Sequence, residues 1–317
     1  MKKILVTGAA GFIGQALCRY LLAHTGHTVF GLDNLNDYYA VQLKYDRLSI
    51  LKEESDRFIF LKADLTDSNK IKKITRQYSF DLVIHLAAQA GVRYSIENPL
   101  VYAQSNLLGF TNILELVKTQ KTPHFIYASS SSVYGNNTQI PFTETDCTDF
   151  PVSFYAATKK SNEVMAHSYA HLYGLSITGL RFFTVYGPWG RPDMAPWLFT
   201  EAILTGKPIK VFNHGKMKRD FTFIDDIVGG IWLLAKSKQR LGSYDHQIFN
   251  IGNNEPVELT VFIECIEKFC GKPAEKIYLP MQDGDVPVTY ANIDKLIQLT
   301  GFRPKTSLTE GDRKSVV

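Results

Sequence analysis

The sequence predicts an α/β fold in which a doubly wound parallel sheet is followed by a smaller mixed α/β lobe. Short runs rich in β-branched and aromatic residues alternate with amphipathic stretches through the first 183 residues, which is the pattern of βαβ units. The runs are apolar at nearly every position, as expected of parallel strands covered by helices on both faces. Beyond residue 183 the alternation stops and the chain becomes richer in glycine and proline.

Six strands and the helices between them can be placed by this alternation. Amphipathic helical patterns lie at residues 11–24 and 107–120, between apolar runs. The expected strands are residues 3–7, 28–32, 58–63, 81–87, 124–129 and 177–182.

Composition and charge are those of an ordinary globular protein. Of the 317 residues, 45% are hydrophobic and 21% are charged. The 35 Lys and Arg residues exceed the 31 Asp and Glu residues by 35 − 31 = 4 without forming a dense basic cluster. No nucleic-acid partner is therefore expected, and the small positive excess weakly favours an anionic substrate.

Cysteine usage and the N-terminus predict a location in the cytoplasm. The four cysteines form no C-x-x-C pair and have no nearby histidine at a zinc-ligand spacing, so no metal site is expected and a reducing compartment is favoured. Met1, Lys2 and Lys3 lead directly into a strand, so no signal peptide is expected. The longest apolar runs are too short to cross a membrane.

The first motif is the glycine turn "VTGAAGFIG" at residues 6–14, which follows a strand and opens a helix. Gly8, Gly11 and Gly14 allow a tight turn and a close approach of the backbone to a pyrophosphate, whose charge meets the helix N-terminus. A tight strand–helix turn without a ligand would explain the glycines alone. It would not explain the acidic residue Asp33 at the end of the second strand, nineteen residues after Gly14. Together these features predict a Rossmann-type domain that binds a dinucleotide.

The acidic residue after the second strand favours NAD over NADP. Asp33 can accept hydrogen bonds from the adenosine ribose and would repel a 2′-phosphate, and no arginine stands immediately beside it. Asp64 follows the third strand and can bond the adenine amino group, or else cap the next helix. The cofactor-binding residues that we expect are Gly8, Gly11, Phe12, Ile13, Gly14, Asp33, Asn34, Asp64, Leu65, Leu86, Ala87, Ala88, Gln89, Tyr155 and Lys159.

We expect residues 1–183 to form the NAD-binding domain, with residues 225–252 returning to it. Residues 184–317, mainly 184–224 and 253–317, are expected to form the substrate-binding lobe.

Two further segments place reactive side chains near the expected cofactor. The serine run in "YASSSSVYG" ends the fifth strand, at the edge of the sheet where ligands bind in open α/β folds. Tyr155 and Lys159 in "SFYAATKKSNE" are four residues apart and share one helix face. A polar turn and an exposed helix face would explain either segment alone. Their combination with the glycine turn favours chemistry, with Lys159 as the functional lysine and Lys160 exposed to solvent.

Taken in order, the glycine pattern, Ser130 and the Tyr155–Lys159 pair resemble the extended short-chain dehydrogenase/reductases, in particular nucleotide-sugar epimerases and dehydratases. The resemblance covers nearly the whole chain. The segments "HLAAQAGVRYS", "YAATKK", "LRFFTVYGPWGRPDMA" and "KRDFTFIDDI" look most like those of UDP-glucuronate 4-epimerases.

The resemblance implies a UDP-sugar substrate and assigns a role to each catalytic residue. Tyr155 would be the general base, and because free tyrosine has a pKa of about 10, the nearby Lys159 charge is expected to favour its phenolate. The lysine would also hold the nicotinamide ribose, and Ser130 would bond the sugar O4. Further substrate contacts are expected from Arg93, Ser131, Ser132, Thr184, Arg191 and Arg219.

Arg191 and Thr184 are the candidates for holding a sugar carboxylate, and Arg219 for the pyrophosphate. Arg93 can equally form a surface salt bridge, and Arg191 can be a merely exposed loop residue. Gln282 stands in the region where related epimerases often carry a basic residue for the second phosphate, so that contact is doubtful.

The activity most consistent with these motifs is interconversion of UDP-glucuronate and UDP-galacturonate by an NAD-dependent isomerase in polysaccharide biosynthesis. A UDP-glucuronate decarboxylase and a neutral UDP-hexose 4-epimerase are the alternatives within the family. A dehydratase is disfavoured, because Ser131 and Ser132 replace its usual Asp-Glu pair. A non-catalytic NAD(H)-binding sensor or scaffold would have no use for the three catalytic residues together.

The resemblance also implies a homodimer that packs helices near residues 99–120 and 153–173 into a four-helix bundle, although core packing explains the same apolar pattern. Residues 308–317 should lead into an amphipathic C-terminal helix with aromatic residues. The sequence stops after this polar segment, so we expect that helix to be missing.

Overall fold

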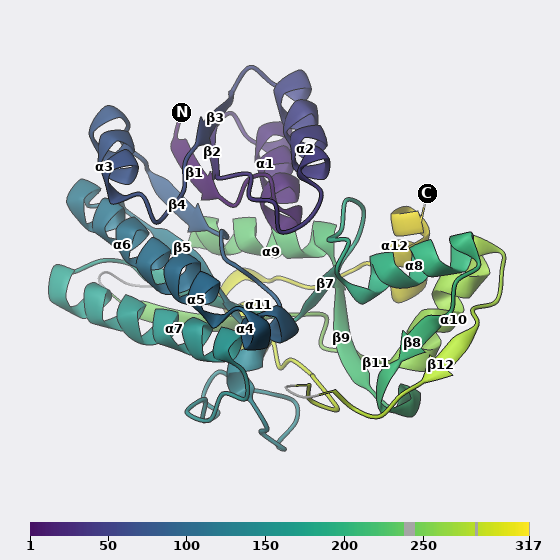
Figure 1. Cartoon of the computed structure of the whole chain (residues 1–317). Coiled ribbons are helices and arrows are strands. Elements are labelled where there is room, and N and C mark those ends of the chain that lie inside the picture. Colours follow the sequence, from purple (N-terminus) through teal and green to yellow (C-terminus); the bar gives the residue numbers. More distant parts are fainter. Residues whose placement is uncertain (238–244, 283–284, 317) are drawn as a thin grey trace.

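The computed structural model describes residues 1–237, 245–282 and 285–316, and Figure 1 shows their arrangement as a large sheet domain beside a smaller lobe. The main sheet has the order β10-β6-β5-β4-β1-β2-β3, and every neighbouring pair is parallel. Its strands are β1 (Lys3–Thr7), β2 (Thr28–Asp33), β3 (Phe58–Lys62), β4 (Leu82–His85), β5 (Phe125–Ser130), β6 (Ile177–Phe182) and β10 (His246–Ile251).

Helices cover both faces of this sheet, which confirms the predicted doubly wound fold. One face carries α3, α6 and α7, and the other carries α1, α2 and α9 (Figure 1). Side chains of β1 alternate between the two cores, with Ile4 and Val6 in one and Leu5 in the other. The helices of this domain are α1 (Phe12–His24), α2 (Val41–Glu54), α3 (Ser68–Gln77), α4 (Val92–Glu97), α5 (Pro99–Tyr102), α6 (Gly109–Gln120), α7 (Phe154–Tyr173), α9 (Ile224–Lys236) and α11 (Asp294–Thr300).

In the part of the chain that the structure describes, the smaller lobe combines two short sheets with three helices. Its sheets have the orders β11-β9-β7 and β12-β8, and α10 packs against both α8 and α12. The buried carboxylate of Asp220 accepts hydrogen bonds from the backbone N–H groups of Asn253, Asn254 and Ala291, which ties β9 to two distant loops. The elements are β7 (Thr184–Tyr186), α8 (Ala195–Thr205), β8 (Ile209–Val211), β9 (Lys218–Phe223), β11 (Pro256–Glu258), α10 (Leu259–Cys270), β12 (Lys276–Tyr278) and α12 (Leu308–Val316).

All six predicted strands are present, although their ends differ. The fourth strand ends at His85 rather than residue 87, because the chain there leaves the sheet and passes close to Gly8. The helix predicted at 107–120 is preceded by α5 and by a π-helical turn, η1 (Ala103–Leu108). In the segment expected to return to the sheet, β10 pairs with β6 and α9 packs on α1, while residues 238–244 lie outside the described part.

The C-terminus differs from its prediction. Residues Leu308–Val316 themselves form helix α12, which packs against α10 and β9. Gly311 allows this contact, since a Cβ there would lie 2.8 Å from the Phe223 ring. The small residue lets this short polar helix approach an aromatic surface.

Candidate active site

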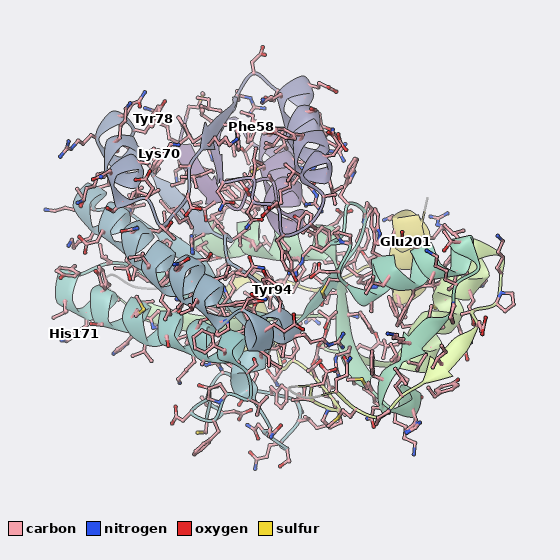
Figure 2. The ribbon with its side chains drawn as sticks, in the orientation of Figure 1. Phe58, Lys70, Tyr78, Tyr94, His171 and Glu201 are labelled. Atoms are coloured by element: carbon pink, nitrogen blue, oxygen red, sulfur yellow. The ribbon has the colours of Figure 1, made fainter. Side chains whose placement is uncertain are left out.

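One large cavity lies between the carboxyl edge of the main sheet and the smaller lobe. Its volume is about 1180 Å³, and the sheet edge is the place where open α/β folds bind ligands. Figure 2 places Tyr94 of α4 on the side of the sheet domain that faces this lobe. Every residue predicted to bind cofactor, bind substrate or take part in catalysis lines this cavity.

The glycine turn forms a tight cradle at one end of the cavity. Gly8 has φ +74°, and a Cβ at this position would lie 2.8 Å from the Ala87 nitrogen. A Cβ on Gly14 would collide with the Gly8 carbonyl oxygen. Gly11 precedes α1 without a side-chain capping hydrogen bond, and Phe12 and Ile13 of the first helical turn line the cavity. The turn thus has the tight backbone geometry that the sequence predicts, and its binding of a pyrophosphate stays a prediction.

Asp33 stands at the end of β2 and is held in place by the glycine turn. Its carboxylate accepts hydrogen bonds from the backbone N–H groups of Ala10, at 3.1 Å, and Leu35, at 2.9 Å. Burial raises its pKa, while these N–H groups and the cations of Lys44 and Arg47 oppose the rise. Because each carboxylate oxygen has a second lone pair, Asp33 can still accept hydrogen bonds from ribose hydroxyls.

Lys44 and Arg47 of α2 were missed by the sequence reasoning, which looked for a cation only immediately beside Asp33. Lys44 is buried, and its ammonium donates to the Asn36 carbonyl at 2.6 Å. Arg47 is also buried and donates to the carbonyl oxygens of Ala10, Trp189 and other neighbours. Only the turns of α2 bring both cations to Asp33, and no short motif reveals this arrangement.

Asp64 is a polar anchor beside Asp33 and does not cap α3. Asn34 donates to its carboxylate at 2.8 Å, and the Thr66 backbone donates at 2.8 Å. Burial raises the pKa of Asp64, but the hydrogen bonds from Thr66 and Asn34 outweigh burial and lower it overall. Asp67 caps the helix by accepting from the Lys70 N–H, so Asp64 remains available to a ligand.

The loop after β4 lies next to the glycine turn, and hydrogen bonds from Asn106 hold this loop in position. The Asn106 side chain accepts from the Gln89 N–H at 2.8 Å and donates to the Gln89 carbonyl at 3.0 Å. It also donates to Thr158 Oγ1 at 3.0 Å. Asn106 lies in the π-helical turn and therefore joins the predicted cofactor loop to the helix of Tyr155.

Helix α7 presents Tyr155 and Lys159 to the cavity from its first turns. Ser153 caps the helix by accepting from the Ala156 N–H at 3.1 Å. The Ser95 hydroxyl accepts from the Tyr155 N–H at 3.1 Å. The Lys159 ammonium is buried and donates to the Ala128 carbonyl of β5, at 2.7 Å. Burial lowers the pKa of Lys159 to about 8.

The effect expected of Lys159 on Tyr155 differs in the structure. The Lys159 Nζ lies 5.9 Å from the centre of the Tyr155 ring. Burial raises the pKa of Tyr155, and the opposing influences come from a hydrogen bond with Ser130 and from the charge of Arg191. Desolvation outweighs both influences, so the protein alone keeps this phenol protonated at neutral pH.

The serine run ends β5 and continues into a 3-10 turn, η2 (Ser131–Tyr134). The Ser130 oxygen accepts from the Ser132 N–H at 3.2 Å, and its hydroxyl lies 3.1 Å from that of Ser132. Ser129 points the other way and donates to Glu163 at 2.6 Å. Ser130, Ser131 and Ser132 thus face the cavity near Tyr155, as predicted.

Arg191 lies close enough to Tyr155 to influence its ionisation, although the two are far apart in sequence. Its guanidinium is paired with Asp193, and the Tyr38 hydroxyl donates to the same carboxylate at 3.0 Å. Asp193 and Tyr38 were missed by the sequence reasoning. The only sequence signal was the position of Asp193 two residues after Arg191.

Arg93 and Arg219 form a second positive group that also includes one carboxylate. Asp285 lies 3.5 Å from Arg93 and 3.9 Å from Arg219. Arg93 also stacks over the Phe212 ring at 5.1 Å, so the salt bridge foreseen for it is present at the cavity wall. Thr184 and Gln282 line the same cavity.

Lys160 differs from its prediction as a solvent-exposed lysine. Its ammonium donates to the Thr148 hydroxyl at 2.6 Å and lies 3.3 Å from the Asp149 carboxylate. Lys160 therefore stabilises the segment before α7 and does not line the cavity.

Across residues 1–237, 245–282 and 285–316, no three His, Cys, Asp or Glu side chains are grouped as metal ligands. No helix in the described part of the chain combines the length and hydrophobicity needed to cross a membrane.

Comparison with known proteins gives consistent matches. The model of the NAD dependent epimerase/dehydratase family matches residues 4–252. Protein CapI of Staphylococcus aureus is 52% identical, over 99% of this chain and 97% of its own length. UDP-glucuronate 4-epimerase 2 of Arabidopsis thaliana is 48% identical, over 99% of this chain and 74% of its own length. The UDP-glucuronic acid 4-epimerase of Bacillus cereus, solved with UDP-glucuronic acid and NAD, is 36% identical and superposes with a TM-score of 0.92 over 99% and 98% of the two chains.

Proposed function

The chain belongs to the NAD dependent epimerase/dehydratase family, and from this premise we propose that it is an isomerase that interconverts UDP-glucuronate and UDP-galacturonate through a 4-keto intermediate. The observation that carries the proposal is the convergence of Ser130, Tyr155 and Arg191 on one cavity beside the glycine cradle. The names of the similar proteins support the uronate as substrate.

The residues fit NAD. The glycine cradle leaves room for a pyrophosphate where any Cβ would collide, and Asp33 can accept from the adenine-side ribose. NAD held by these residues would supply the hydride acceptor, and later the hydride donor, for the sugar C4. We assign the cofactor to the residues that line the cradle and Lys159 to the ribose beside the nicotinamide.

Tyr155 removes the proton from the sugar O4 and later returns it. Ser130 is hydrogen-bonded to Tyr155 and shares in this proton transfer. The phenol needs more positive charge than the protein alone supplies, because burial keeps its pKa high. A cationic nicotinamide beside it would supply that charge. The reaction is redox-neutral overall, since one hydride leaves C4 and one returns.

The 4-keto intermediate of a uronate is a β-keto acid that can lose carbon dioxide. An epimerase must therefore hold the carboxylate so that the C5–C6 bond stays out of alignment with the carbonyl π system. We assign this task to Arg191 and Thr184, with Ser131 and Ser132 as further sugar contacts, because all four line the cavity. Arg93 and Arg219 then hold the pyrophosphate of the UDP group.

We also propose that one part of the chain binds the cofactor and the other binds the UDP-sugar. Residues 1–183, with 225–252, hold the cofactor, and the UDP-sugar is held mainly by residues 184–224 and 253–317, although α11 within the last range packs on β10 and α9 of the sheet domain. The pairing of β10 with β6 supports the assignment of residues 246–251 to the first part.

We further propose that the protein is a homodimer. Exposed apolar side chains gather on the neighbouring helices α4, α5, η1 and α7, which lie together in Figure 1. A second copy that packs the same helices would cover them as a four-helix bundle. The side chains are Ile96, Leu100, Val101, Leu108, Phe154, Val164, Leu172 and Tyr173.

A cytoplasmic location and a role in polysaccharide biosynthesis complete the proposal. Cys18 and Cys147 keep free thiols, which suits a reducing compartment. An activated uronate is a donor for glycosyl transfer into acidic polysaccharides.

The test is to incubate the purified protein with UDP-glucuronate and separate the products. UDP-galacturonate in equilibrium with substrate is the expected result. UDP-xylose or a 4-keto pentose as main product would mean decarboxylation, and conversion of UDP-galactose without any uronate turnover would mean a neutral-sugar epimerase. Binding without turnover of any of these sugars would favour a sensor or scaffold.

Substitution of Tyr155 tests the catalytic assignment. Tyr155→Phe should lower turnover by about 10²–10⁴-fold while NAD stays bound, since only the proton transfer is lost. The matched control is Tyr45→Phe, which removes an exposed hydroxyl on α2. Retained activity in Tyr155→Phe would remove Tyr155 as the base.

A further inference from the structure

Arg191 lines the cavity, and one edge of its guanidinium is paired within the protein. Its Nε donates to Asp193 Oδ1 at 3.0 Å, and its Nη2 donates to Asp193 Oδ2 at 2.5 Å. The Nη2 also donates to the Ala90 carbonyl at 3.2 Å. In the described part of the chain, no hydrogen bond engages Nη1. One edge of the fork is thus occupied by a carboxylate of the protein itself, and Nη1 is the nitrogen left for a ligand.

Asp193 is held by residues of two separate loops. Asp193 and Arg191 belong to the loop before α8, whereas the Tyr38 hydroxyl that donates to Asp193 comes from the loop after β2. The Tyr38 ring packs on that of Tyr94 with centres 4.8 Å apart. The side chains of Arg191 and Asp193 are 20% and 31% exposed, so their charges offset each other in a partly desolvated site.

We propose that Asp193 determines the sugar selectivity of this site by occupying one edge of Arg191 and cancelling most of its charge. The inference rests on the proposed function, in which Arg191 contacts the sugar carboxylate. The carboxylate of a uronate then contacts Arg191 through Nη1 alone, beside a nearly neutral ion pair, and cannot form a bidentate pair with a free guanidinium. The carboxylate is oriented by hydrogen bonds and is not held by a full charge, which limits the preference for uronates over neutral sugars.

The experiment compares the affinities of UDP-glucuronate and UDP-glucose in a background that cannot turn over. Calorimetry on the Tyr155→Phe protein gives the ratio of the two dissociation constants, and the same ratio is then measured after Asp193→Asn and Asp193→Ala. Both substitutions leave Arg191 with an uncompensated charge, so the preference for UDP-glucuronate should rise by about tenfold. The matched control is Asp37→Asn, which removes an exposed carboxylate outside the cavity lining.

A purely structural role of Asp193 would weaken the binding of both sugars by the same factor. An unchanged or lower ratio in both variants, with the folded state retained, overturns the inference. In variants with Tyr155 restored, the KM for UDP-glucuronate should fall more than kcat changes, because ground-state binding is what improves.

The inference and the proposed function can fail separately. The ratio of dissociation constants needs no turnover, so it tests Asp193 even where the wild-type protein converts no uronate. Conversely, wild-type conversion of UDP-glucuronate to UDP-galacturonate with an unchanged ratio in the variants would leave the function standing and remove the role of Asp193.

Discussion

Glu163 and Arg181 form a buried ion pair beneath the serine run. Two guanidinium nitrogens of Arg181 donate to the two carboxylate oxygens of Glu163, each at 2.9 Å, and both side chains are 3% exposed. Ser129 donates to the same carboxylate at 2.6 Å. Because Glu163 lies on α7 and Ser129 on β5, the pair joins the helix of Tyr155 to the strand that carries Ser130.

Glu163→Gln should destabilise the protein by about 3 kcal/mol, because the charge of Arg181 would remain buried without its partner. Urea unfolding at pH 7 measures the change. Glu264→Gln, on the exposed face of α10, is the matched control and should change stability by less than about 0.5 kcal/mol. A loss in Glu163→Gln no larger than that of the control would contradict the structural importance of the pair.

Lys159→Met should make the nucleotide-free protein more stable at pH 7 while abolishing turnover. Burial depresses the pKa of Lys159 from 10.5 to about 8, so at pH 7 the folded state carries a buried charge that disfavours folding. Its removal should stabilise the protein by about 1–3 kcal/mol, allowing for the hydrogen bond to Ala128. Urea unfolding of both proteins measures the difference.

The advantage of Lys159→Met should shrink as the pH rises from 8 to 10.5. In this window the unfolded wild-type chain binds the lysine proton and the folded protein does not, so wild-type stability gains with pH relative to the variant. A difference in stability that is constant with pH would show that the Lys159 ammonium is not desolvated. Lys62→Met, at an exposed position on β3, controls for loss of a lysine.

Gly14→Ala should abolish NAD binding and destabilise the protein by about 1–3 kcal/mol, because the new Cβ would collide with the Gly8 carbonyl in the tight turn. Fluorescence titration with NADH and thermal unfolding measure the two effects. Gly26→Ala is the matched control, since a Cβ there meets nothing within 4 Å. Normal NAD binding in Gly14→Ala would mean that the turn does not form the cofactor cradle.

Charges placed on the exposed helix face should produce a monomer. Leu100 of α5 and Leu172 of α7 are 77% and 64% exposed. With Glu at both positions, formation of the proposed four-helix bundle would remove two carboxylate charges from water. Sedimentation velocity should show a dimer for the wild type and a monomer for the double variant. Leu204→Glu on α8, also an exposed leucine, should leave the dimer intact. A wild-type monomer at all concentrations would end the dimer proposal.

The elements and motifs that depend on local interactions could be predicted from the sequence. The strands could be predicted because parallel strands covered on both faces are apolar throughout. The turn at Gly8 could be predicted because only glycine suits its positive φ and close contacts. The spacing of Tyr155 and Lys159 placed both on one face of α7, since helical periodicity needs no knowledge of the rest of the chain.

Features that depend on burial and on residues distant in sequence became visible only in the folded chain. Folding brought Tyr38 to Asp193, 155 positions away, and paired Lys160 with Thr148, which no short motif encodes. It also reversed the expected direction of the Tyr155 pKa, because desolvation outweighs the nearby charges. Local patterns specify which side chains are present, whereas the energies of those side chains are set by the solvent they lose and the charges they meet when the chain folds.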